Sequence, residues 1–94
     1  MLRVWMDRTG HRKGRYKMVT AYILVQTDVG KAGQVAKAIM DIREVRSADG
    51  VTGPYDVIAR AESNNIDSLG KLVVARVQAI SGVTRTLTCP VVHL

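Results

Sequence analysis

The chain has 94 residues, a length that suits one small domain with a modest core. Hydrophobic residues make up 47% and charged residues 23%, which excludes a disordered chain, and no apolar run is long enough to cross a membrane. The net charge of +6 is uneven, because residues 1–17 carry six of the fourteen basic residues and one of the eight acidic residues. The rest of the chain is almost neutral, which argues against a basic DNA-reading face.

Residues 1–18 form a basic segment that has no regular apolar period and lacks the apolar core of a secretory signal. We expect a disordered extension, and Met18, directly before the first predicted strand, suggests an alternative start. Trp5 and Tyr16 are too few and too scattered to form a stacking platform for nucleic acid. The single cysteine, Cys89, excludes an intrachain disulfide, so we expect a cytoplasmic protein.

The ordered domain is predicted to begin with a strand over residues 19–27, which are rich in β-branched side chains. Both faces of this strand are apolar, which suggests that the second face is also covered, for example by another subunit. Residues 28–43 carry apolar side chains at helical spacing and predict an amphipathic helix on the sheet. Asp28 or Gly30 is expected at its N-terminus.

A hairpin is predicted in the middle of the chain. Residues 44–52 indicate a weaker strand, with a bulge or bend expected at Asp49 and Gly50. Residues 55–63 indicate the third strand.

The last two elements are a helix and a strand. Residues 64–80 have an asparagine cap and apolar side chains at helical spacing, and Gly70 in their middle is expected to allow close packing on the sheet. Ser81 and Gly82 are predicted to end the helix. Residues 83–94 then supply a strand, with Pro90 marking its edge or its end.

The predicted order β-α-β-β-α-β is that of a ferredoxin-like α+β fold. Right-handed crossovers would place both helices on one face of a four-stranded antiparallel sheet and leave the other face open. Because that open face is partly apolar, we expect residues 19–94 to dimerise through it.

Few residues are placed for catalysis. The histidines, His11 and His93, are not spaced from Cys89 or from a carboxylate as metal ligands would be. Cys89 is expected to be a small packed side chain. Residues 28–33 contain Gly and Lys before a helix but lack the spacing of a phosphate loop. We therefore expect no metal, no cofactor and no identifiable catalytic machinery.

Two further patterns have a structural and a functional interpretation. Thr84, Thr86 and Thr88 alternate on one face of the last strand, where strand propensity explains them and a polar pocket lined by hydroxyls is the alternative. In the segment VTGPYD, residues 51–56, the Gly-Pro pair makes the turn, the tyrosine packs and the aspartate caps a turn amide. The alternative is a binding site, and spacing alone slightly favours the structural interpretation.

Two motifs within residues 20–92 resemble the effector-binding (RAM) domain of the Lrp/AsnC family of transcriptional regulators. The family's Val-x-Gly-x-Tyr-Asp hairpin is matched by Val51, Gly53, Tyr55 and Asp56. Its Gly-Val-x-x-Thr-x-Thr entry to the last strand is matched by Gly82, Val83, Thr86 and Thr88.

This resemblance implies a ferredoxin-like domain that dimerises through its sheets and assembles into octamers or similar rings. It implies that an amino acid or related effector binds between dimers, where turn amides receive its carboxylate and an aspartate receives its ammonium group. The contacts carried over to this chain are Thr52, Gly53, Tyr55, Asp56, Thr86 and Thr88. The segment before the first strand is too short for the family's helix-turn-helix domain, so the chain resembles a stand-alone form without direct DNA binding.

We therefore expect a non-enzymatic oligomeric module that binds a small effector and modulates transcription, with co-assembly with full-length Lrp/AsnC regulators as one route. One alternative is an enzyme of the dimeric α/β-barrel type, such as a monooxygenase or isomerase, which shares the β-α-β-β-α-β order. The other is a purely structural assembly partner.

Overall fold

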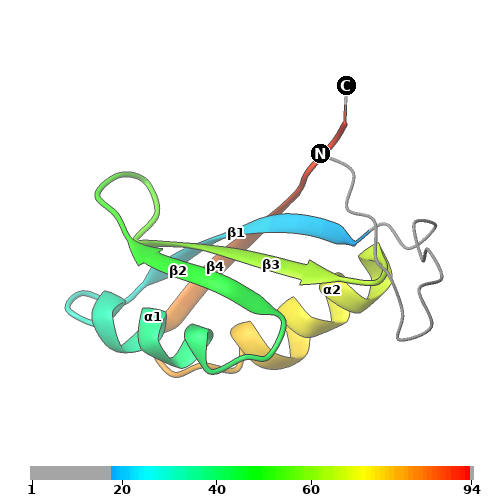
Figure 1. The fold of residues 1–94 in the computed structure, drawn as a ribbon. Coiled ribbons are helices and arrows are strands. Elements are labelled where there is room, and N and C mark those ends of the chain that lie inside the picture. Colours follow the sequence, from blue (N-terminus) through cyan, green and yellow to red (C-terminus); the bar gives the residue numbers. More distant parts are fainter. Residues whose placement is uncertain (1–17, 94) are drawn as a thin grey trace, which may run out of the picture.

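The computed structural model describes residues 18–93, so the predicted N-terminal extension lies almost entirely outside the described residues. The elements follow the predicted order, and the second helix continues as a π-helical segment, η1 (Figure 1). Their bounds are β1 Val19–Thr27, α1 Ala32–Met40, β2 Val45–Gly50, β3 Val57–Ser63, α2 Ile66–Leu72, η1 Val73–Val77 and β4 Val83–Pro90.

The four strands form one antiparallel sheet in the order β2-β3-β1-β4. Both helices cover the same face of this sheet, as Figure 1 shows from the side. The ferredoxin-like α+β fold predicted from the sequence is confirmed. β1 lies between β3 and β4 in the sheet, so it is hydrogen-bonded to the middle hairpin on one side and to the last strand on the other.

The core lies between the sheet and the helices and is built from alternate residues of the central strands. Ile23 and Val25 of β1 are fully buried, and Ile39 of α1 and Leu69 of α2 cover them from the helix layer. Alternation follows from the two-residue period of a strand, which sends successive side chains to opposite faces. Burying a side chain of this size contributes about 1.5–3 kcal/mol to folding.

The other face of the sheet, here called the open face, carries a row of apolar side chains across three strands. Leu24 of β1 pairs with Ile58 of β3 on one side and with Leu87 of β4 on the other. Leu87 is 45% exposed and Tyr22 is 43% exposed. The prediction that both faces of the first strand are apolar is confirmed.

Two details of the first helix and the second strand differ from the sequence prediction. The N-cap of α1 is Lys31, without a side-chain hydrogen bond, so the cap expected from Asp28 or Gly30 is wrong. The backbone N–H of Asp28 instead donates to the carbonyl of Gly82 at 2.8 Å, which ties the loop to the start of β4. In β2 the irregularity lies between Val45 and Ser47 and not at residues 49–50, which pair regularly with β3.

The start of the second helix is as predicted, and its end is not. Asn65 caps α2, because its Oδ1 accepts a hydrogen bond of 2.7 Å from the N–H of Ser68. The helix widens into η1, where the N–H of Gln78 donates to the carbonyl of Val73 at 3.0 Å. Since the helical segment ends at Val77, the end predicted at residues 81–82 is wrong.

The two glycines of this region also have other roles than predicted. Gly82 forms the turn into β4 with a φ of 98°, and a Cβ there would lie 3.1 Å from the Cβ of Lys31. Gly70 is exposed, and no heavy atom of residues 18–93 lies within 4 Å of the position of its missing Cβ. The expected packing of Gly70 on the sheet is therefore wrong.

Candidate functional site

The middle hairpin and the start of β4 lie at the same end of the sheet, on either side of the end of β1. Val25 of β1 pairs with Val57, directly after the hairpin, and with Thr86 of β4. Neighbouring strands lie about 4.8 Å apart, so the hairpin end of β3 and β4 are separated by about 10 Å. This places the two predicted groups of site residues at one end of the domain.

Asp56 is held in place by the end of β1. Its Oδ2 accepts a hydrogen bond of 2.8 Å from the backbone N–H of Thr27, and its own N–H donates to the carbonyl of Val25 at 2.9 Å. The regular pairing of β1 with β3 ends at Val25. The carboxylate of Asp56 therefore accepts from the next amide of β1 that faces β3, which would otherwise lack a partner in the sheet. Asp56 thus caps an amide, but the prediction of a turn amide is wrong, because the donor is Thr27 of β1.

The rest of the hairpin is accessible. Thr52, Gly53 and Pro54 are exposed, and Tyr55 is half-buried. The hairpin is closed at its base, where the N–H of Val51 donates to the carbonyl of Asp56 at 2.9 Å. A fixed base with an exposed tip suits a segment that contacts a ligand or a neighbouring subunit.

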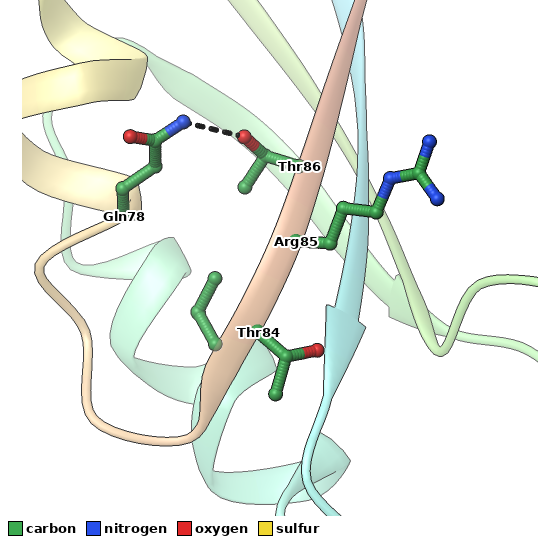
Figure 2. Close-up of a pocket in the computed structure, with 5 residues that line it drawn as sticks. Gln78, Thr84, Arg85 and Thr86 are labelled. Atoms are coloured by element: carbon green, nitrogen blue, oxygen red, sulfur yellow. Dashed lines mark hydrogen bonds between the residues drawn. The ribbon is translucent and has the colours of Figure 1, made fainter.

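On the other side of β1, polar side chains line an open depression of about 420 Å³ beside β4. Its lining residues are Gln78, Val83, Thr84, Arg85 and Thr86. Figure 2 shows Gln78 reaching Thr86 from the end of the helical segment, with a hydrogen bond of 2.9 Å from Nε2 to Oγ1. Arg85 belongs to the lining, although the end of its side chain points away from Gln78.

Two of the three alternating threonines of β4 lie beside the depression. Thr84 Oγ1 donates to the carbonyl of Gln26 at 3.1 Å, and Thr84 and Thr86 both line the depression. Thr88 pairs with Ile23, further along the strand, and does not line it. The predicted alternative of a pocket lined by hydroxyls therefore describes Thr84 and Thr86.

Gln78 and Arg85 are lining residues that the sequence interpretation did not single out. Gln78 follows a helical segment, and Arg85 lies between two threonines, so both resemble ordinary surface residues in the sequence. Their place beside the depression depends on the packing of η1 against β4. No local pattern in the sequence would have revealed it.

Other kinds of site have less support in the described part of the chain. Among residues 18–93, no group of three or more His, Cys, Asp and Glu side chains is placed to hold a metal ion. Cys89 is a free thiol of intermediate exposure. Within the same residues, none of the helices has the length and apolar character needed to span a bilayer.

Comparison with known proteins identifies the family. Residues 20–93 match the family model described as the Lrp/AsnC ligand binding domain. The chain belongs to the Lrp/AsnC family. This Lrp/AsnC domain is 29% identical to an uncharacterised helix-turn-helix-type transcriptional regulator of Pyrococcus furiosus, over 72 residues that cover 73% of this chain and 48% of the regulator. The chain thus spans about half the length of the curated relatives it matches.

Solved structures share the fold of this Lrp/AsnC domain. The protein TTHA0845 from Thermus thermophilus superposes with a TM-score of 0.76 and 26% identity, and the match covers 81% of this chain and 95% of that one. The transcriptional regulator NMB0573 from Neisseria meningitidis, solved as a complex with L-Met, has a TM-score of 0.71 and 21% identity over 80% of this chain and 50% of its own. The family assignment made from the two motifs is confirmed, and regulatory domains of this family are generally non-enzymatic.

Proposed function

We propose that this chain is a non-enzymatic oligomeric module that binds an amino acid or a similar small effector and modulates transcription. The supporting observation is that the hairpin and the polar start of β4 lie at one end of a domain whose family is defined by ligand binding. The Neisseria regulator with the same fold was solved with L-Met, which supports an amino acid as the class of effector.

The hairpin offers groups for both ends of an amino acid. The carboxylate of Asp56 attracts an ammonium group, while the hydroxyl of Thr52 and the exposed backbone of Gly53 suit a carboxylate. Tyr55 is half-buried beside them and adds an aromatic wall. These four residues are the proposed contacts on the hairpin.

The proposed site requires more than one copy of the chain. A small-ligand site normally buries most of its ligand, whereas the hairpin tip is exposed and the depression at β4 is open. Thr86, whose oxygen already accepts from Gln78, keeps a hydroxyl proton to donate, and Thr88 continues the row along β4. We therefore place the effector between dimers, with the hairpin of one copy facing a neighbouring copy.

The dimer itself is proposed to form through the open face. The apolar row of Leu24, Ile58 and Leu87, together with Tyr22, would be removed from water by a second sheet packed face to face. Full-length family members contain the same domain, so the same contact supports co-assembly with them. We propose a cytoplasmic location for the chain. We do not propose that it binds DNA directly.

Calorimetric titration of the assembled protein with each of the twenty amino acids tests the proposal. We expect saturable binding of at least one amino acid at or below millimolar concentration. Asp56→Asn keeps an oxygen to accept the Thr27 N–H and removes the charge, so it should weaken binding at least tenfold without changing the assembly. Asp41→Asn, at the exposed end of α1, is the matched control and should bind as the wild type does. Absence of binding by the assembled protein would contradict the proposal.

The enzyme alternative has less support. A dimeric α/β-barrel enzyme needs a cavity between sheet and helices that contains a polar catalytic group. In this protein, fully buried apolar side chains such as Ile23, Ile39 and Leu69 occupy that layer. The buried polar residue of the described region, Glu62, pairs with Thr20 in the sheet and forms an ion pair with Arg60 at 2.9 Å.

A further inference from the structure

A row of polar residues crosses the sheet at the end that carries the hairpin. Arg85 of β4 pairs directly with Gln26 of β1. On the other side of β1, Asp56 is hydrogen-bonded to Val25 and to Thr27. These two are the chain neighbours of Gln26, so Asp56 and Arg85 lie on either side of the same residue. A negative and a positive side chain are thus separated by one strand, with their backbones about 10 Å apart.

Both charged groups of this row are available to a ligand. Arg85 is exposed and forms no ion pair within residues 18–93, whereas Arg60 pairs with Glu62 at 2.9 Å. The carboxylate of Asp56 uses Oδ2 for its hydrogen bond, and Oδ1 has no partner among the described residues. Asp56 and Arg85 do not pair with each other, so a ligand can lie between them.

We propose that the effector is an amino acid with a carboxylate in its side chain, and that Arg85 is the residue that selects it. This inference rests on the proposed function, in which the hairpin binds the ammonium group and the α-carboxylate. These two groups are attached to one carbon atom, so the hairpin can hold both while the effector side chain extends across β1. At the far side it meets the guanidinium of Arg85, which binds a carboxylate through two parallel hydrogen bonds.

The position of Arg85 suits a carboxylate at the end of a short carbon chain. The long side chain of Arg85 and the carbon chain of aspartate or glutamate together span the separation between β4 and the hairpin. Figure 2 shows that the end of the Arg85 side chain points away from Gln78, so the contact of Gln78 with Thr86 does not occupy the guanidinium.

Other classes of effector side chain fit these surroundings less well. The lining of the depression beside β4 contains Arg85 and no acidic residue. A basic effector side chain would therefore meet a like charge without a counter-charge. An amide of the same shape can accept a hydrogen bond from the guanidinium, but it lacks the charge that strengthens the bond.

Calorimetric titration of the assembled protein with two matched pairs of ligands tests the selection. Glutamate and glutamine differ in charge and hardly in shape, and so do aspartate and asparagine. We expect at least one of the two acids to bind at least tenfold more tightly than its own amide. Equal or tighter binding of both amides would overturn the inference.

Substitution of Arg85 tests whether this residue is the selector. Arg85→Gln changes an exposed side chain, so the variant should fold and assemble, as circular dichroism and sedimentation velocity measure. It should bind the preferred acid and its amide with affinities within about threefold of each other. Arg85→Lys keeps the charge without the two parallel hydrogen bonds and should retain part of the preference. A full preference in Arg85→Gln would overturn the role of Arg85.

Arg43→Gln is the matched control. Arg43 is also exposed, and it precedes β2 at the end of the sheet opposite to the hairpin. This variant should keep the full preference for the acid. Loss of the preference in Arg43→Gln would show that overall charge, and not Arg85, selects the effector, and it would overturn the inference.

The same titrations separate this inference from the proposed function. If amino acids bind and neither acid is preferred over its amide, the selection by Arg85 fails and the effector-binding function stands. If no amino acid binds to the assembled protein, both fail.

Discussion

The two faces of β1 differ in how far the chain itself buries them. On the inner face, Ala21, Ile23 and Val25 are fully buried beneath the helices. On the outer face, the aromatic side chain of Tyr22 remains 43% exposed and the apolar side chain of Leu24 is half-buried. The inner row is buried within the chain, and the outer row is the surface on which we propose that a second copy packs. Substitutions on the two faces should therefore affect different properties, stability on one face and association on the other.

The open face also contains a buried charged residue, Glu62, whose ion pairs form within the chain. The carboxylate of Glu62 is nearly inaccessible and pairs with Arg60 at 2.9 Å and with Arg46 at 3.5 Å. The two arginines compensate the charge of this buried carboxylate. The apolar centre of the open face, and not Glu62, is the part that we propose a second copy covers.

The largest effect on stability is expected from the inner face. Ile23→Ala removes fully buried side-chain atoms and leaves a cavity, so it should lower the free energy of unfolding by about 2–5 kcal/mol. Urea denaturation measures this change. A loss below about 1 kcal/mol would show that the inner face is less tightly packed than the structure indicates.

On the outer face, Leu87→Arg should act on association. The side chain is 45% exposed, so the folded chain can accommodate an arginine that extends into water. We expect at least a tenfold increase in the dissociation constant of the dimer, measured by analytical ultracentrifugation, with an unchanged circular dichroism spectrum. Unfolding of the variant would contradict the division between the two faces.

At the end of β1, Asp56→Ala should destabilise the domain by about 1–3 kcal/mol, because the part-buried N–H of Thr27 loses its acceptor. Asp56→Asn should lose less than half as much stability as Asp56→Ala. Thermal unfolding of both variants separates the structural role of the carboxylate from its charge. Equal stability of Asp56→Ala and the wild type would mean that solvent replaces this hydrogen bond without cost.

The smallest expected change is a gain in stability. Gly70→Ala should raise the free energy of unfolding by about 0.5–1 kcal/mol, because alanine is the better helix former and no atom of the described residues obstructs its Cβ. Urea denaturation measures this change. A loss of stability would show that Gly70 is required by the chain's own fold.

Local patterns predicted much of the fold and part of the candidate site. The strand of residues 19–27 and the cap at Asn65 depend on near neighbours in the chain, and both predictions agree with the structure. The end of the second helix was misplaced because the turn at η1 widens, which the apolar spacing does not show. The orientation of Gly70 was predicted wrongly, because a residue without a side chain adds nothing to the apolar spacing that shows which side of a helix is buried.

The sequence by itself determined the order of the elements, the two apolar faces of β1 and the family, because periodicity and short motifs are local properties of the chain. Only the tertiary structure decided that Asp56 caps Thr27 and that Gln78 reaches Thr86. It also decided that Gly70 faces outward. These outcomes depend on how the helices and strands pack together, and the spacing of residues along the chain does not record that packing.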